Sequence, residues 1–227
     1  MSTPSRKTSK KNSDWHEIVL RLRKALDGSQ EPSVSTVAAQ FRDPFRILIS
    51  TVISLRTKDE VTTQAGERLF SRAATPKEVA ALSVEEIARL IYPAGFYNTK
   101  AENIKAIAGT IAARTDAQVP RAQEELLALP GVGRKTANLV LGLGFAIPAI
   151  CVDTHVHRIP NRLGMVQTKS PAQTEQALEE SLPKEYWIEI NGLLVRFGQI
   201  VCTPLSPRCS RCPLSDLCPR IGVERSR

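Results

Sequence analysis

The amino-acid sequence predicts an all-α protein, and three observations lead to this class. Apolar residues recur at helical spacing in most segments, and no stretch shows the polar–apolar alternation of a half-buried strand. Ala, Leu and Ile dominate the apolar residues, whereas aromatic residues make up only 5% of the 227-residue chain. This composition favours helix packing over aromatic-rich sheets. The length allows one large domain or two small ones.

The N-terminal region combines a polar segment with a first helix. Residues 1–13 are rich in Ser, Thr, Lys and Arg and contain no acidic residue. We therefore expect a disordered basic arm there. From Trp15 onward the pattern is helical, because Ile18, Leu22 and Leu26 recur at four-residue spacing.

The middle of the chain carries helix caps and periodic apolar residues. The segments 75–78 (Thr-Pro-Lys-Glu) and 83–86 (Ser-Val-Glu-Glu) have the pattern of capping boxes, so a helix is expected to start at each. Pro130 ends the last helix of this region. The apolar periodicity predicts four further helices, at about 44–55, 59–71, 99–114 and 122–129.

Three further helices are expected toward the C-terminus. One begins after Gly133, the segment 170–173 caps a second, and the last covers about 186–201. Residues 147–152 are apolar and could form a short strand, but one strand does not make a sheet.

Charge and hydropathy narrow the class of partner. The formal net charge of +8 favours a polyanionic partner, although many basic proteins bind no nucleic acid. No apolar run approaches the roughly 20 residues that span a bilayer, and the N-terminus lacks the apolar core of a secretory signal. We therefore expect a protein of the cell interior that does not engage a membrane.

Four of the five cysteines lie within seventeen residues, with the spacing Cys-x6-Cys-x2-Cys-x5-Cys. They are Cys202, Cys209, Cys212 and Cys218. Zinc sites usually pair two Cys-x-x-Cys knuckles or combine Cys with His, whereas iron–sulfur clusters accept irregular loops. Spacing alone leaves both open, and disulfides are disfavoured inside cells. Cys151 lies between apolar residues and is expected to be a buried small hydrophobe.

A glycine turn between two helices is a candidate phosphate site. Gly131 and Gly133 permit positive φ or close approach of a DNA backbone. The N–H groups at the start of the next helix can bind a phosphate. Arg134 adds charge and Thr136 lies in the same turn, so all four residues are candidate DNA contacts. The alternative is a tight helix-to-helix turn without a ligand.

Two residues are candidates for the chemistry of bond cleavage. Lys135 would lie in the first turn of a helix, where the dipole disfavours the ammonium and so favours the free amine. An amine can attack a sugar C1′ and form a Schiff base, although a phosphate contact is the simpler role. Asp153 could stabilise an oxocarbenium-like sugar or cap a helix that starts at Thr154. We expect structural or DNA-facing roles for His155 and His157.

Together these motifs resemble the endonuclease III family of DNA repair glycosylases. The segment 129–138 (LPGVGRKTAN) resembles the helix-hairpin-helix of that family, and 152–155 (VDTH) resembles its catalytic aspartate segment. The cysteine spacing is similar to its [4Fe-4S] loop, and 95–104 (GFYNTKAENI) looks like a further segment of the family. The resemblance spans about 43–218, with the motifs in the family's order.

The resemblance implies a two-domain helical fold with a [4Fe-4S] cofactor held by the four clustered cysteines. A six-helix barrel domain with the helix-hairpin-helix would cover 37–147. A discontinuous iron–sulfur domain would combine 14–36 with 148–227. The DNA cleft would lie between the domains, with Lys135 and Asp153 facing each other across it.

The resemblance also implies an activity. The protein would be a monomer, and in a bacterium it would work at the nucleoid in the cytoplasm. It would bind duplex DNA that carries a damaged base or an abasic site. It would remove an oxidised pyrimidine through a Schiff base on Lys135 and then cleave the strand by β-elimination. Asp153 would assist deprotonation. Phe96 and Arg56 fall where the family inserts side chains into DNA, and Arg56 departs from the family's glutamine. His155 would be a further DNA contact.

Two alternatives remain open at this point. One is a monofunctional mismatch glycosylase of the same fold, which acts without the lysine and forms no covalent adduct. The other is a non-catalytic helix-hairpin-helix DNA-binding module. The presence of Lys135 argues against the first, and the joint presence of Lys135 and Asp153 argues against the second.

Overall fold

The computed structural model describes residues 6–29 and 31–227, and these residues form helices, turns and irregular segments but no strand. The predicted all-α class is confirmed. Residues 147–152, considered as a strand, are extended chain without a ladder. The chain divides into two compact units. The central unit is Pro32–Ile147, and the terminal unit combines the chain before Pro32 with Pro148–Arg227.

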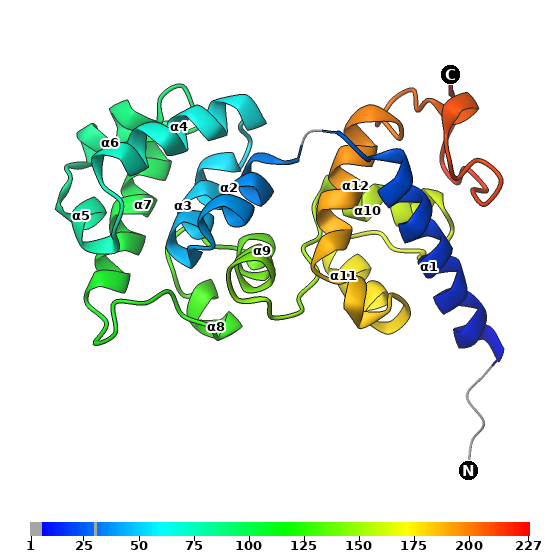
Figure 1. Ribbon diagram of the computed structural model, residues 1–227, viewed down its shortest axis with the longest axis horizontal. Coiled ribbons are helices and arrows are strands. Elements are labelled where there is room, and N and C mark those ends of the chain that lie inside the picture. Colours follow the sequence, from blue (N-terminus) through cyan, green and yellow to red (C-terminus); the bar gives the residue numbers. More distant parts are fainter. Residues whose placement is uncertain (1–5, 30) are drawn as a thin grey trace, which may run out of the picture. The chain divides into compact units, whose positions relative to one another are not determined.

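The central unit is built around one helix that is buried on nearly all sides. Helix α3 packs against α2, α4, α7 and α9 (Figure 1). Eight of its eleven residues are buried, as expected for a helix that is apolar all round. The helices of this unit are α2 (Ser33–Phe41), α3 (Pro44–Ser54), α4 (Asp59–Arg72), α5 (Pro76–Ala81), α6 (Val84–Ile91), α7 (Tyr97–Ala112), α8 (Gln123–Leu127) and α9 (Arg134–Phe145).

Local capping bonds fix several of these boundaries. At α5 the Thr75 hydroxyl accepts a bond from the Glu78 N–H, and the Glu78 carboxylate accepts from the Thr75 N–H, which confirms the predicted capping box. At α6 the Ser83 hydroxyl accepts from the Glu86 N–H. The Asp43 carboxylate caps α3 in the same way. Each such cap stabilises a helix start by about 1 kcal/mol.

The terminal unit has its own apolar core. Ile18 and Leu22 of the first helix are fully or almost fully buried there, as their spacing predicted, and Trp15 is buried with them. Helix α12 packs against α1 and α10 in this core (Figure 1). The elements of this unit are α1 (Arg6–Ala25), α10 (Thr154–Arg162), α11 (Pro171–Ser181), η1 (Lys184–Tyr186), α12 (Glu189–Ile200) and η2 (Cys209–Arg211), the two η elements being 3-10 helices.

The disordered arm expected at residues 1–13 overlaps the start of helix α1 and stays a prediction. Helix α1 begins at Arg6, and residues 1–5 lie outside the described residues. From Arg6 to Ala25 the sequence contains neither glycine nor proline, and lysine and arginine are good helix formers. The helix of the terminal core therefore continues backward through the basic segment. None of the described helices has the length and apolar character needed to cross a membrane.

Candidate functional site

The glycine turn between α8 and α9 has two glycines with different reasons to be glycine. Gly131 has a φ of +70°, and a Cβ there would lie 2.4 Å from the Asn103 side-chain nitrogen. The fold itself therefore requires glycine at 131. Gly133 is extended, with a φ of −97°, and a Cβ there would meet no atom within 4 Å. The space beside Gly133 is open in the protein alone.

Lys135 lies in the first turn of α9 and is half-buried. Gly133 is the N-cap residue of this helix and makes no side-chain capping bond. Arg134 is exposed, as its predicted role requires. Thr136, however, is only 1% exposed. The Thr136 side chain packs into the central unit, so a DNA contact at this residue would run through its main chain, and the predicted contact stays a prediction.

Asp153 caps α10, as one of its two predicted roles required. Its Oδ1 accepts bonds from the N–H groups of His155, at 2.9 Å, and Val156, at 2.8 Å. These bonds fix the orientation of the half-buried carboxylate and leave Oδ2 outside the cap. The side chain is thus held in one place by backbone geometry, which is what a group that must act on a substrate needs.

The two histidines after Asp153 are part of the packing of the terminal unit. A Cβ at Gly198 would lie only 2.1 Å from the His155 Nδ1, so α10 and α12 meet closely at that glycine. His155 Nδ1 also lies 3.1 Å from an Arg158 guanidinium nitrogen. His157 shares a hydrogen bond with Thr174, which joins α10 to α11. These contacts give both histidines structural roles, and the predicted DNA contact of His155 stays a prediction.

Arg56 and Phe96 form an exposed pair on the central unit. The Arg56 guanidinium carbon lies 5.5 Å from the centre of the Phe96 ring. Phe96 is 64% exposed, so it is not a core aromatic residue. Both residues have positive φ, +53° for Arg56 and +57° for Phe96. An exposed aromatic ring next to an exposed cation suits insertion between bases.

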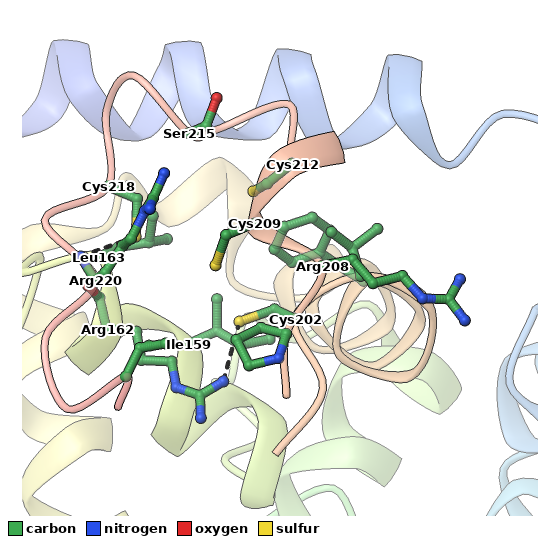
Figure 2. Close-up of a pocket in the computed structure, with 14 residues that line it drawn as sticks. Ile159, Arg162, Leu163, Cys202, Arg208, Cys209, Cys212, Ser215, Cys218 and Arg220 are labelled. Carbon is green, nitrogen blue, oxygen red and sulfur yellow. Dashed lines mark hydrogen bonds between the residues drawn. The ribbon is translucent and has the colours of Figure 1, made fainter. Parts of the chain in front are cut away.

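The four clustered cysteines lie around one pocket in the terminal unit (Figure 2). All are free thiols. Apolar residues such as Ile159, Leu163 and Phe197 form part of the wall, and burial raises the pKa of the Cys212 and Cys218 thiols. Such a pocket of thiols fits a metal cluster, which binds thiolates and repays their desolvation.

Arginine side chains surround the same pocket. Arg162, Arg208 and Arg220 line it, and the charge of Arg220 acts against burial by lowering the pKa of the Cys218 thiol. Arg162 is buried at the end of α10 and donates to the Thr203 carbonyl at 2.8 Å and to the Pro204 carbonyl at 2.5 Å. Its guanidinium also contacts the Cys202 sulfur at 3.5 Å (Figure 2). Arg162 therefore ties α10 to the cysteine loop. Cys151 is separate from the pocket and buried, as predicted.

Comparison with known proteins decides the family. Residues 49–184 match the model of the HhH-GPD superfamily of base excision DNA repair proteins. Residues 202–218, bounded by the outer two cysteines of the cluster, match the iron-sulfur binding domain of endonuclease III. The endonuclease III of Thermotoga maritima is 51% identical over 176 residues, which cover 78% of this chain and 83% of that protein. The chain belongs to the endonuclease III family.

Two solved structures of endonuclease III bound to DNA have the same fold. A non-covalent endonuclease III–DNA complex is 34% identical, with a TM-score of 0.81, and the match covers 92% of this chain and 95% of that one. A trapped endonuclease III–DNA covalent intermediate, an estranged-adenine complex, is 35% identical, with a TM-score of 0.78 and coverage of 90% and 95%.

Family membership settles several expectations from the sequence. The protein is a DNA glycosylase of base excision repair, and its cofactor is a [4Fe-4S] cluster. The zinc alternative and the non-catalytic DNA-binding module are therefore excluded. The pocket in Figure 2 is consistent with this cofactor, because its donor set consists of thiols alone.

Sequence reasoning missed a buried polar residue, Lys100, that holds the turn carrying Arg56 in place. Lys100 is buried and bonded to the turn that carries Arg56. A signal was present, because Lys100 falls on the same helical face as Ile104, Ile107 and Ile111. A lysine in the apolar stripe of a helix needs a partner for its charge.

Proposed function

We propose that this endonuclease III relative removes oxidised pyrimidines from duplex DNA and cleaves the strand through a Schiff base on Lys135. The observation that carries the proposal is the half-buried lysine in the first turn of α9, directly after the glycine turn. The trapped covalent intermediate of a protein that is 35% identical supports a covalent step.

DNA docks through the glycine turn in this proposal. The main chain around Gly131 and Gly133 approaches a phosphate, and Arg134 adds a charge-assisted contact. The open space beside Gly133 supports this role, because nothing in the protein alone requires glycine at that position. His155 and the main chain of Thr136 are the further proposed contacts. The non-covalent DNA complex of a 34% identical relative supports DNA as the partner.

The damaged nucleotide then leaves the base stack, and Arg56 and Phe96 enter the space that it vacates. Phe96 supplies an apolar surface for the neighbouring bases. Arg56 donates hydrogen bonds to the base opposite the lesion, and an arginine has no acceptor to offer. An orphan guanine presents two acceptors, O6 and N7, so it is the preferred opposite base.

The chemistry requires one nucleophile and one carboxylate. The Lys135 Nζ, as the free amine, attacks C1′, and the base leaves with the electron pair of the N-glycosidic bond and takes up a proton. The C1′–O4′ bond then opens to give the Schiff base, with the proton from nitrogen passing to O4′. Water takes a C2′ proton, the electron pair of that C–H bond forms the C2′–C3′ double bond, and the C3′–O bond breaks with its electron pair leaving on the 3′ phosphate. Asp153 accepts the proton of Lys135 and stabilises positive charge on the sugar.

The four cysteines of the pocket hold the [4Fe-4S] cluster in this proposal. When bound, the cluster cross-links the loop from Cys202 to Cys218, a structural contribution. Arg162 orients the start of that loop through the Thr203 and Pro204 carbonyls. Arg208 and Arg220, which lie in and beside the loop, contact DNA phosphates.

Borohydride trapping tests the proposed chemistry. The protein is incubated with duplex DNA that contains an oxidised pyrimidine, and borohydride is added to reduce any Schiff base. We expect a covalent adduct with the wild-type protein and none with Lys135→Ala. The matched control is Arg134→Ala, the preceding residue, which keeps the adduct but binds DNA more weakly. Base release without an adduct in the wild-type protein would instead indicate a monofunctional mismatch enzyme.

We further propose that the protein acts as a monomer and, in a bacterial cell, at the nucleoid. The surplus of positive charge supports retention on DNA. Light scattering during size-exclusion chromatography checks the oligomeric state, and a mass of two chains would contradict the proposal.

A further inference from the structure

Lys100 of α7 is a buried cation whose three donors are all used. The side chain is 5% exposed, and burial lowers the pKa of Lys100 to about 8. Its Nζ donates to the Ile53 carbonyl at 2.6 Å, the Leu55 carbonyl at 2.6 Å and the Thr57 hydroxyl at 2.8 Å. An ammonium has three N–H groups, so every donor is satisfied by a neutral oxygen.

These bonds join the two loops that carry Arg56 and Phe96. The carbonyls of Ile53 and Leu55 belong to the C-terminal end of α3, where backbone acceptors lack helical partners and attract cations. Thr57 Oγ1 also accepts a bond from the N–H of Gly95 at 3.0 Å. One ammonium group is therefore linked through one hydroxyl to the residue that precedes Phe96. We call Lys100, Thr57 and Gly95 the Lys100 clamp.

The two loops meet at their backbones within the clamp. A Cβ on Gly95 would lie 2.5 Å from the Arg56 carbonyl oxygen, so only glycine permits this approach. Arg56 and Phe96 each adopt a positive φ, which is unfavourable for residues other than glycine. Such conformations persist where the surrounding structure fixes them, and they concentrate at functional sites. The Lys100 clamp provides that constraint on both sides.

We propose that Lys100 is a positioning residue that sets the preference for the base opposite the lesion. Its ammonium group fixes Arg56 and Phe96 as one preformed pair, so the guanidinium reaches the orphan base without first ordering two loops. Binding groups that are already ordered lose less entropy on complex formation. This inference rests on the proposed DNA contacts of Arg56 and Phe96. It adds a buried residue that does not touch DNA itself.

The same helix provides a matched control. Lys105 is half-buried, and its Nζ donates to the Ala80 carbonyl at 3.2 Å and to the Leu82 carbonyl. Lys105 thus binds the C-terminal end of α5, as Lys100 binds that of α3. The loop that Lys105 binds, after α5, carries neither Arg56 nor Phe96. A general loss of helix capping would affect both lysine variants, whereas loss of positioning affects only Lys100.

The experiment measures the opposite-base preference in single turnover. Duplexes carry an oxidised pyrimidine opposite guanine or adenine, and the ratio of the two base-release rates is compared between variants. We expect the wild-type protein to favour guanine by about tenfold. Lys100→Met, which keeps the unbranched stem, loses most of this preference, as does Arg56→Ala. Lys105→Met keeps the wild-type ratio.

A second pair of variants tests the clamp without removing a buried charge. Thr57→Val preserves the shape of the side chain but removes the hydroxyl, and we expect the preference to fall. Thr57→Ser keeps the hydroxyl and the preference. The double variant Lys100→Met with Arg56→Ala should show the same ratio as Arg56→Ala alone, because Lys100 acts through Arg56.

Four results would overturn the inference. These are an unchanged ratio in both Lys100→Met and Thr57→Val, an equal loss in Lys105→Met, a further loss in the double variant, or an unchanged ratio in Arg56→Ala. The proposed chemistry fails separately, since it predicts the loss of the borohydride adduct in Lys135→Ala. The adduct on DNA with a preformed abasic site should still form with Lys100→Met, whose Lys135 is intact.

Discussion

Helices α9 and α10 start in different ways, although the backbone leaves the same N–H groups unpaired at the start of any helix. At α10 the Asp153 carboxylate accepts two of these N–H groups and is held in place by them. At α9 the N-cap residue is Gly133, which makes no side-chain capping bond. One start is capped by a side-chain anion of the protein, whereas the N-cap residue of the other is a glycine, which has no side chain to cap with.

The difference matches the two proposed roles. A helix start with glycine at the N-cap lets a phosphate approach closely, and the N–H groups and the helix dipole both favour an anion. A carboxylate used as a cap is already oriented, and this suits a group that must stabilise charge on a substrate. Each helix start thus combines a stabilising role with a chemical one, and the following predictions separate the two.

The largest expected effect is on Asp153, where asparagine separates charge from capping. Asparagine caps a helix as well as aspartate does, so Asp153→Asn should unfold at the wild-type temperature. It carries no charge, and base release should slow by about 10²-fold or more, since removal of one preorganised stabilising group has effects of this size. Single-turnover kinetics and thermal unfolding measure the two properties.

Asp153→Ala is the matched variant. Its rate of base release should fall as far as that of Asp153→Asn. In addition, its free energy of unfolding should fall by about 1 kcal/mol, because two N–H groups lose their acceptor. If Asp153→Asn keeps the wild-type rate while Asp153→Ala is destabilised, Asp153 is a cap alone, and its catalytic role is wrong.

Sequence patterns predicted the features that depend on near neighbours. The Thr75 box and the Asp153 cap each join residues two to three positions apart, so the spacing alone implies the contact. The buried stripe of Ile18 and Leu22 follows in the same way from helical periodicity. The four cysteines from Cys202 to Cys218 lie in one short segment, so their spacing alone implies that they line one pocket.

The features that sequence patterns missed join distant parts of the chain. Lys100 contacts residues 43 to 47 positions earlier, and no local pattern indicates such a pairing. The positive φ of Arg56 and Phe96 is equally invisible, because neither residue type favours that conformation. The burial of the Thr136 side chain on the inner face of α9 is likewise not indicated by its place in the motif. Tertiary packing decided each of these cases.

The two glycines of the α9 turn should respond differently to alanine. Gly131→Ala forces a side chain into a positive φ and against Asn103, so the free energy of unfolding should fall by about 1–2 kcal/mol. Gly133→Ala meets no protein atom within 4 Å and should stay within about 0.5 kcal/mol of wild type. Its methyl group, however, fills the space proposed for a phosphate, so DNA affinity should fall by about tenfold. Chemical denaturation and DNA-binding titrations distinguish the two effects. If Gly133→Ala binds DNA with the wild-type affinity, no phosphate binds at this helix start.

The smallest expected effect concerns the salt dependence of DNA binding. Arg134 stands at the start of α9, where a phosphate would sit between its guanidinium and the helix N–H groups. A protein that makes one phosphate contact fewer releases about one counterion fewer when it binds DNA. Arg134→Ala should therefore lower the slope of log affinity against log salt by about 1. Arg72→Ala is the control, since it also removes one positive charge. Arg72 is exposed and pairs with Glu86 at 2.9 Å, so the slope should not change. If the two variants change the slope equally, Arg134 acts only through net charge, and the start of α9 has no phosphate of its own.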